Sequence, residues 1–396
     1  RIQEPMANPR RTAAVLIAAA LTSAALFIFK INGDMMDFNV NYAAGDRLVH
    51  GETLYRASDE HYQFKYAPFC AMIYAPLSLL PPAAARAIWY ALVLTSTAGM
   101  ILLTIRLIRG NDAAVEGGLG PRVSALLAGL VLAKFILREI QLGQINAIIT
   151  VLMLLVIFNL YKDETNKPAV GRAAASGLLW GLATAMKPYS LIFLPYFLLK
   201  RRWNILWPAL LFLGLSLIAP AVYYGFPGNL AVHVEWITTL MRSTSTLLDT
   251  QDNVSLLAGL TKWTGDPGLA QMGFVFFLLA LVLLVFFFIR RRREKTGSAV
   301  PEGALLLLLV PLISPLGWDY TFLSSILAVA IVFRHLHRFP KIGRLFLILN
   351  FTVIGLSLFD LLGRKAYAVF MSASVLTLNF LVIVVAMVSL RWTRKI

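Results

Sequence analysis

Long apolar segments alternate with short polar segments along the whole chain. Each apolar segment approaches the roughly 17–25 residues that a helix needs to cross a bilayer, although the shorter ones require tilt or re-entry. We therefore expect an all-α polytopic membrane protein that forms a single integral membrane domain over residues 1–396. About 12 transmembrane helices are predicted, near residues 12–30, 83–108, 122–137, 147–161, 172–186, 188–199, 204–222, 270–290, 302–316, 320–333, 345–361 and 369–390.

Two longer loops, 31–82 and 223–269, interrupt this alternation, and both mix carboxylates with aromatic residues. The first contains KYAPFCAMIYAPLSLLPP, whose apolar run between prolines is too short to span and predicts an interfacial or re-entrant helix. The second contains NLAVHVEWITTLMRSTSTLLDTQDN, whose apolar spacing predicts an amphipathic surface helix ending near Asp249. Both loops are thus expected to hold short helices.

The charge distribution orients the predicted spans. The sequence is 59% hydrophobic and only 14% charged, with a net charge of +16. If the N-terminus lies inside, 24 of the 36 Lys and Arg residues fall in cytoplasmic segments, as the positive-inside rule requires. The pattern places both termini in the cytoplasm and both long loops outside, and it argues against nucleic acid as a partner. Because 12–30 is long and lacks a small-residue cleavage site, it is predicted to be a membrane helix rather than a cleavable signal peptide.

Few residues suit metal or cofactor chemistry. Cys70 is the only cysteine, which excludes a disulfide framework and a cysteine metal cluster. The five histidines are scattered, and the sequence has no Gly-rich phosphate loop, H-E-x-x-H motif or G-x-S-x-G elbow. No cofactor is expected. A divalent cation held by acidic residues is the less favoured alternative.

Loop 31–82 carries six carboxylates just beyond the first apolar segment. Asp37 lies in MMDFNVNYAAGDRL, with Tyr42 five residues on, and Asp34 is its rival nearer the membrane. Either carboxylate on its own would be explained equally well as solvated loop surface. Glycosyl transfer from a phosphate-linked donor needs one base to accept the proton of the attacking hydroxyl, and the leaving phosphate needs no general acid. Asp37 is the favoured base for such a reaction.

Cations and amides that suit a phosphate-linked sugar follow in LAKFILREIQLGQINAI. Lys134 and Arg138 are four residues apart, on one helix face, and an intramembrane lysine is a functional-site hypothesis by default. Snorkelling of Lys134, or pairing with Glu139, is the structural alternative. The predicted uncharged donors to a lipid phosphate or sugar are Gln141, Gln144 and Asn146.

Three later segments add candidates. Lys187 in ATAMKPYS precedes a helix-breaking proline and is either a phosphate ligand or an interface anchor. In TQDNVSLLAGL, Asp252, Asn253 and Ser255 precede an apolar run, and a helix N-cap alone would explain one of the three. SPLGWDYTFLSS predicts a break between spans that places Trp318, Asp319 and Tyr320 at the outward surface, where aromatic residues are also common anchors.

The ordered set of these segments resembles glycosyltransferase family 87, of the GT-C fold, which includes polyprenyl-phosphate-mannose-dependent mannosyltransferases. The matching segments are DFNVNYAAGDRLVHGETLY, FKYAPFCAMIYAPLSLLP, LGQINAIITVLML, GLLWGLATAMKPYSLIFLPYFLLKRRW, NVSLLAGL and SPLGWDYTFL, over roughly residues 37–325. The resemblance implies an aspartate base at Asp37 and carries the family's GQ-x-N and KP marks onto Gln144, Asn146, Lys187 and Pro188. Relatives often show histidine soon after the late tryptophan, where this chain has Asp319 and Tyr320 after Trp318.

Together these points predict an inverting glycosyltransferase. It would move a hexose, with mannose expected, from a polyprenyl monophosphate to a glycolipid, glycan or protein acceptor at the outward face of a bacterial cytoplasmic (inner) membrane. Asp37 would be catalytic, and the predicted substrate-binding residues are Asp34, Tyr42, Tyr66, Lys134, Arg138, Gln141, Gln144, Asn146, Lys187, Asn253, Trp318 and Asp319. Lys134, Arg138 or Lys187 would hold the donor phosphate.

Two other classes of protein fit parts of the pattern. A secondary transporter commonly has twelve spans with both ends inside, but it favours ionisable groups near the midplane and repeated halves. Here most carboxylates crowd the outward loops, and no strong internal repeat is visible. A non-catalytic membrane scaffold is the third reading.

Overall fold

The computed structural model describes residue 18 and residues 21–111, 117–291, 297–393 and 396. These ranges form helices and connecting turns, with one isolated β-bridge between Asn253 and Trp318. The N-terminal elements are η1 (Phe27–Ile31), α2 (Met36–Val49), η2 (Ala57–Tyr62) and α3 (Pro68–Ser78). They are followed by α4 (Pro82–Asn111), α5 (Pro121–Val131), α6 (Ala133–Leu142), α7 (Asn146–Thr165) and α8 (Val170–Met186).

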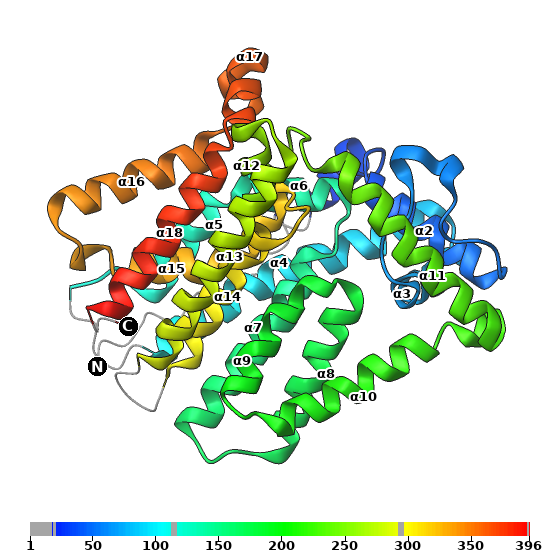
Figure 1. Ribbon diagram of the computed structural model, residues 1–396, viewed down its shortest axis with the longest axis horizontal. Helices are drawn as coiled ribbons and strands as arrows, with labels where there is room; N and C mark the ends of the chain where they lie inside the picture. Colours follow the sequence, from blue (N-terminus) through cyan, green and yellow to red (C-terminus); the bar gives the residue numbers. More distant parts are fainter. Residues whose placement is uncertain (1–17, 19–20, 112–116, 292–296, 394–395) are drawn as a thin grey trace.

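The middle of the chain continues with η3 (Pro188–Phe193), α9 (Leu194–Leu199), α10 (Trp203–Ile218), α11 (Ala221–Leu247), α12 (Leu256–Thr264) and α13 (Pro267–Arg290). The C-terminal elements are α14 (Ala299–Ile313), η4 (Asp319–Ser325), α15 (Ile326–Arg334), η5 (Leu336–Arg338), α16 (Lys341–Leu356), α17 (Phe359–Ser372) and α18 (Val375–Trp392). Figure 1 shows these helices packed side by side, with α17 projecting away from the bundle.

Four described helices, α4, α7, α13 and α18, are long and apolar enough to cross a membrane. Two bent pairs, α10 with α11 and α16 with α17, raise this number to six if each pair is one span. Five shorter apolar helices of 10–17 residues lie among them. The polytopic helical class is confirmed, whereas twelve spans remain a prediction.

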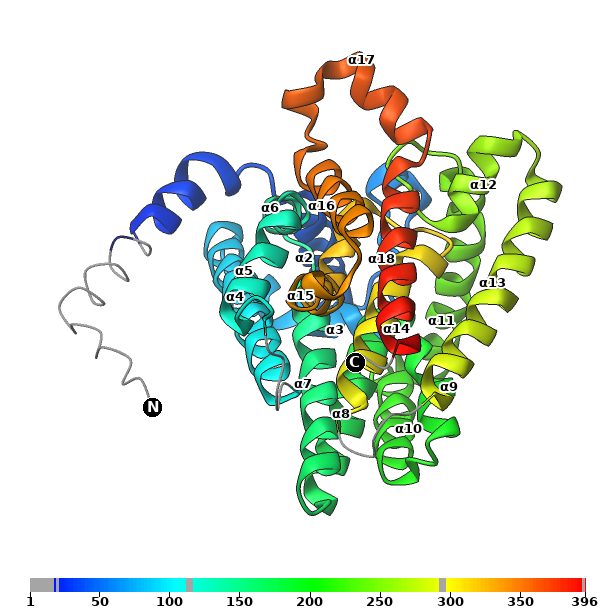
Figure 2. The ribbon, with the colours of Figure 1, turned by 90° about the vertical axis from the view of Figure 1, so that its left-hand side faces the viewer.

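The centre of the bundle is formed by α14 and α15. Every residue of α14 except Ile313 is buried, as is every residue of α15. A helix that is apolar all round is stable only when protein or lipid surrounds it. Here α7, α18 and η4 pack against α14, and α5 packs against α15 (Figure 2).

Several predicted boundaries differ from the structure. The predicted helix 122–137 is divided at Leu132 into α5 and α6, and 369–390 covers the end of α17 and most of α18. Loop 31–82 is largely helical. Asp37 lies inside α2, and the short apolar run between prolines forms α3. The segment predicted to form a surface helix in the second loop lies in the later part of α11, which ends at Leu247. Much of the predicted helix 12–30 lies outside the described residues.

A glycine turn between α6 and α7 packs against α2. Helix α6 ends at Leu142, and Gly143 caps it with a φ of +68°, a left-handed conformation that glycine adopts without strain. A Cβ at this position would lie 2.7 Å from the Cβ of Phe38 on α2, so only glycine allows this approach. The indole of Trp89 fixes the turn by donating a 2.8 Å hydrogen bond to the Gly143 carbonyl. The next residue, Gln144, is thereby held beside α2.

Candidate active site

The first turn of α2 presents Asp37 as a partly exposed carboxylate. One turn further along α2, Asn41 fixes the helix against α3 by donating a hydrogen bond of 3.2 Å to the Tyr74 hydroxyl. At Gly45 the two backbones approach so closely that a Cβ would lie 2.7 Å from the Tyr74 carbonyl carbon. This packing holds α2 rigidly, and a carboxylate in a first turn is favoured by the helix dipole.

Gln144 is the hub that connects Asp37 to the rest of the site. Its Nε2 donates to Asp37 Oδ2 at 2.6 Å and lies 3.1 Å from the Tyr320 hydroxyl. Its Oε1 accepts from the Tyr66 hydroxyl at 3.1 Å and lies 3.5 Å from Lys187 Nζ. One buried amide thus faces a carboxylate with its nitrogen and a cation with its oxygen.

Lys187 lies where α8 ends, and Pro188 prevents the helix from continuing. Its Nζ donates to Asn146 Oδ1 at 2.7 Å and lies 5.2 Å from the centre of the Tyr66 ring. The Asn146 oxygen also accepts from the Tyr189 hydroxyl at 3.3 Å. The ammonium group is therefore held by amide oxygens and aromatic rings.

Glu139 fixes the Asn146 side chain and the first turn of α7. The residue is fully buried, and its two carboxyl oxygens accept from Asn146 Nδ2 at 2.7 Å and from the Ala147 backbone N–H at 2.8 Å. Because Asn146 donates to Glu139, its oxygen is turned towards Lys187. Glu139 thus orients the amide that holds the cation, whereas Lys134, its predicted alternative partner, bonds to Ser357.

A second lysine approaches Asp37 from the segment between η2 and α3. The pKa of Lys65 lies below its usual value because burial disfavours the charged form, an effect that Asp37 opposes by attraction. The Lys65 carbonyl accepts a 3.1 Å hydrogen bond from the Trp236 indole of α11. The two predicted outward loops therefore meet beside the carboxylate.

Five predicted residues come together in this site, namely Asp37, Tyr66, Gln144, Asn146 and Lys187. Sequence reasoning did not assign Lys65, Glu139, Tyr189 or Tyr320 to it. Tyr189 follows the KP mark and Tyr320 follows Asp319, so adjacency to marked residues was the available signal for both. Lys65 lies in the matching segment FKYAPFCAMIYAPLSLLP but was not singled out there, and Glu139 carries no motif. The packing of α2, α3 and α6 reveals the place of both.

The other predicted cations face a different neighbourhood. Lys134 donates to the backbone carbonyl of Ser357 at 3.0 Å and to the hydroxyl of the same residue. Arg138 is exposed on the same helix, and both cations attract the carboxyl group of Asp319. The structure therefore does not bring Lys134, Arg138 and Asp319 into contact with the Gln144 cluster.

The remaining candidates make local contacts. Asp34 accepts from Gln141 at 3.0 Å, one step away from the pair of Asp37 and Gln144. Tyr42 donates to the backbone carbonyls of Ser78 and Leu80, at 3.3 and 2.8 Å, so its hydroxyl fastens α2 to the end of α3.

Asn253 joins two chain segments rather than binding the cluster. Its Nδ2 donates to the Leu247, Leu248 and Pro315 carbonyls, and its Oδ1 accepts from the Ser255 and Gly317 N–H groups. Its backbone forms the β-bridge to Trp318. Of the three residues that an N-cap could explain, Ser255 is the N-cap of α12, and its hydroxyl accepts from the Ala258 N–H at 3.0 Å.

A cavity of about 490 Å³ opens along another face of α2. Its lining includes Met36 and Val40, which flank Asp37 on the helix, and the exposed ring of Tyr62. Arg47 and Asp59 close one part of it as a two-point ion pair, with contacts of 2.5 and 3.0 Å. Within the described ranges, no three His, Cys, Asp or Glu side chains are grouped so that they could hold a metal ion.

Comparisons with known proteins identify the family of this chain. Residues 64–315 match the model of glycosyltransferase family 87, which is more than half of the chain. Two crystal structures of ArnT from Cupriavidus metallidurans are similar over 96% of this chain. The apo structure has 13% identity, a TM-score of 0.39 and 78% of its chain covered. The structure bound to undecaprenyl phosphate has 15% identity and a TM-score of 0.40, and 77% of its chain is covered.

No curated protein matches the chain. The family match includes Tyr66, the Gln144–Asn146 turn and Lys187, which the structure brings together at one site. It ends at residue 315, just before Trp318 and Asp319. The chain belongs to glycosyltransferase family 87, a GT-C group of membrane glycosyltransferases.

Proposed function

We propose that this membrane glycosyltransferase moves a hexose, with mannose the expected sugar, from a polyprenyl monophosphate to an acceptor hydroxyl. The acceptor is carried by a glycolipid, glycan or protein. The site faces outward from a bacterial cytoplasmic membrane, with both termini inside. The proposal is supported most directly by the Gln144 amide, which links the carboxylate of Asp37 to the ammonium of Lys187.

The two ends of this link suit the two halves of the reaction. The acceptor hydroxyl gives its proton to the Asp37 carboxylate as its oxygen bonds to the anomeric carbon. The bond from that carbon to the phosphate oxygen breaks, and the electron pair leaves with the polyprenyl phosphate. Attack from the face opposite the phosphate inverts the anomeric centre. Lys187 stabilises the negative charge that grows on the leaving phosphate.

The surroundings of Asp37 favour this division of roles. The carboxylate is partly exposed and so reachable by an acceptor, whereas the amides of Gln144 and Asn146 are buried. The cavity along α2 gives an acceptor sugar a route to the first turn of that helix. Lys65 supplies positive charge near this carboxylate.

Asp37→Asn tests the base, because an amide cannot accept the acceptor proton but has nearly the same shape. We expect transfer of labelled sugar from the lipid donor, measured in nanodiscs, to fall by at least about 10²–10⁴-fold while donor binding is retained. Asp46→Asn is the matched control, since Asp46 is an exposed carboxylate on the same helix. An active Asp37→Asn enzyme would refute the assignment.

A further inference from the structure

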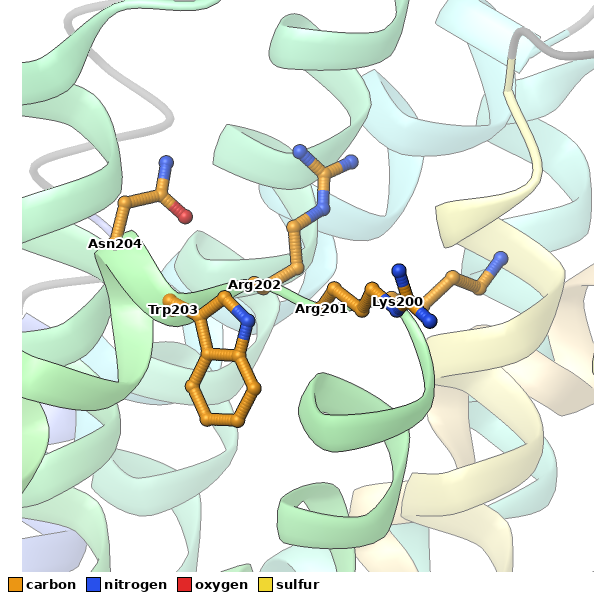
Figure 3. Close-up of a pocket in the computed structure, with 5 residues that line it drawn as sticks. All are labelled: Lys200, Arg201, Arg202, Trp203 and Asn204. Carbon is orange, nitrogen blue, oxygen red and sulfur yellow. The ribbon is translucent and has the colours of Figure 1, made fainter.

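A basic cavity lies away from the active site, at the turn between α9 and α10. It encloses about 430 Å³ and is lined by Lys200, Arg201, Arg202, Trp203 and Asn204 (Figure 3). Helices η3 and α9 separate Lys187 from this turn along the chain, so the cavity lies at the other end of these two helices. The mechanism above uses none of its residues.

One of the three cations has a structural role. Lys200 Nζ lies 2.7 Å from Glu302 Oε2, and Arg391 lies 3.2 Å from the other oxygen of that carboxylate. All three side chains are almost completely buried. Glu164, the next carboxylate in this region, accepts from the Ser298 hydroxyl and the Ala299 N–H at the start of α14. Glu302 and Glu164 are thus both engaged by other groups.

Arg201 and Arg202 make no ion pair with any residue in the described part of the chain. Figure 3 shows the Arg202 guanidinium on the opposite side of the backbone from the Trp203 ring. Helix α10 begins directly after them, with no side chain capping its first N–H groups. Two uncompensated guanidinium groups at the mouth of a cavity form a site for phosphate oxygens.

The surface beside the cavity matches the depth of lipid headgroups. Trp203 and Trp207 are 51% and 66% exposed, and they lie one turn apart on the same face of α10. Exposed tryptophans of this kind settle at the boundary between acyl chains and headgroups. Leu210 and Leu211 continue an exposed apolar surface along the helix. A phosphate bound by the arginines would therefore have acyl chains beside it.

The geometry points to a binding site for the phosphate of an anionic phospholipid, formed by Arg201 and Arg202 and bordered by Trp203. Phosphate oxygens bind the guanidinium groups, and the acyl chains lie along the apolar face of α10. The site is separate from the sugar-transfer centre and does not depend on the proposed reaction.

Native mass spectrometry of the purified full chain in detergent tests the site, with phosphatidylglycerol and phosphatidylcholine of identical acyl chains as probes. The wild type is expected to retain phosphatidylglycerol preferentially. R201A/R202A is expected to weaken the retention of phosphatidylglycerol about thirtyfold, because each of the two cations contributes a similar share of the binding free energy to an anionic headgroup. R106A/R109A is the matched control, since it removes two exposed arginines of α4 outside the cavity.

Three results would overturn the inference. Equal retention by R201A/R202A and the wild type would exclude the cavity, and equal losses in both double variants would indicate general surface charge. Displacement of the lipid by inorganic phosphate at equal concentration would identify a free-anion site instead. Circular dichroism checks the fold of each variant, and R201Q/R202Q replaces the alanine pair if that pair does not fold.

Discussion

Two buried amides, Gln144 and Asn253, show how similar side chains serve different purposes in this protein. Both were candidates for binding substrate, and both lie just before a helix begins. Gln144 bonds to four side chains from different parts of the chain, and two of these side chains are charged. The Asn253 amide bonds to backbone groups alone, from segments 247–255 and 315–317.

The difference separates chemistry from scaffold. An amide bound to backbone groups fixes the path of the chain, and its partners have no other task. An amide between a partly exposed carboxylate and a cation adjusts the positions of groups that react. We therefore expect Gln144 substitutions to change catalysis and Asn253 substitutions to change stability, and the following predictions test that contrast.

After Asp37, Lys187 is the neighbour of Gln144 whose replacement, by methionine, should have the largest effect. Loss of a preorganised group that stabilises transition-state charge typically lowers the rate by about 10²–10³-fold. We expect a decrease of this size in kcat/KM for transfer from the lipid donor, with a clear decrease in kcat. Steady-state assays in nanodiscs with saturating acceptor measure it.

Lys262→Met is the matched control from the scaffold region. The Lys262 ammonium donates to the backbone carbonyls of Gln251 and Asn253, at 3.1 and 2.7 Å. Loss of this ammonium should lower thermal stability, because hydrogen bonds to backbone carbonyls contribute about 0.5–1.5 kcal/mol each to the free energy of unfolding. It should leave kcat within about threefold of the wild type. Equal kinetic losses in the two lysine variants would contradict the division between regions.

Gln144→Leu should follow, with a decrease of up to about 100-fold in kcat. The substitution retains bulk but removes the bond that positions Asp37, and small misplacement of a reacting group costs about this much. The expected sign of a positioning role is that kcat falls while the donor dissociation constant, from lipid-binding titration, stays near the wild-type value. Gln141→Leu, which removes only the bond to Asp34, serves as the control.

Much of this site was visible in the sequence because its residues stand at helix ends. The proline after Lys187 and the glycine before Gln144 mark helix ends, and polar groups at helix ends are available for function. Asp37 followed an apolar segment, which placed it near the membrane surface. Order along the chain and local chemistry were enough to choose these three residues.

The sequence did not determine which helix ends meet. Lys134 and Arg138 share a face of α6 as predicted. However, the helix break at Leu132 and the packing of α16 place Lys134 where it donates hydrogen bonds to Ser357. Glu139 lies on the other side of the same helix and supports Asn146 instead. Hydrophobic periodicity predicted the helices, whereas the rotation of α6 about its axis depends on contacts distant in sequence.

Asn253→Ala is expected to destabilise the fold with little change in catalysis. The substitution leaves the buried N–H groups of Ser255 and Gly317 without their acceptor, at about 1–3 kcal/mol each. We expect an apparent Tm lower by several degrees and a kcat within about threefold of the wild type at a temperature where both are folded. A kcat loss beyond tenfold with unchanged Tm would place Asn253 in the binding site after all.

The smallest effect is expected at Asp34, the rival base. Asp34 and Asp37 are each bound by one glutamine of the α6–α7 region, at 3.0 and 2.6 Å. Only the partner of Asp37 also faces Lys187, so only Asp37 is connected to a cation that can hold the leaving phosphate. Asp34→Asn keeps an oxygen that can accept from Gln141, and transfer should stay within about twofold of the wild type. If Asp34→Asn proved as inactive as Asp37→Asn in the same nanodisc assay, the connection to Lys187 would not be what distinguishes the base.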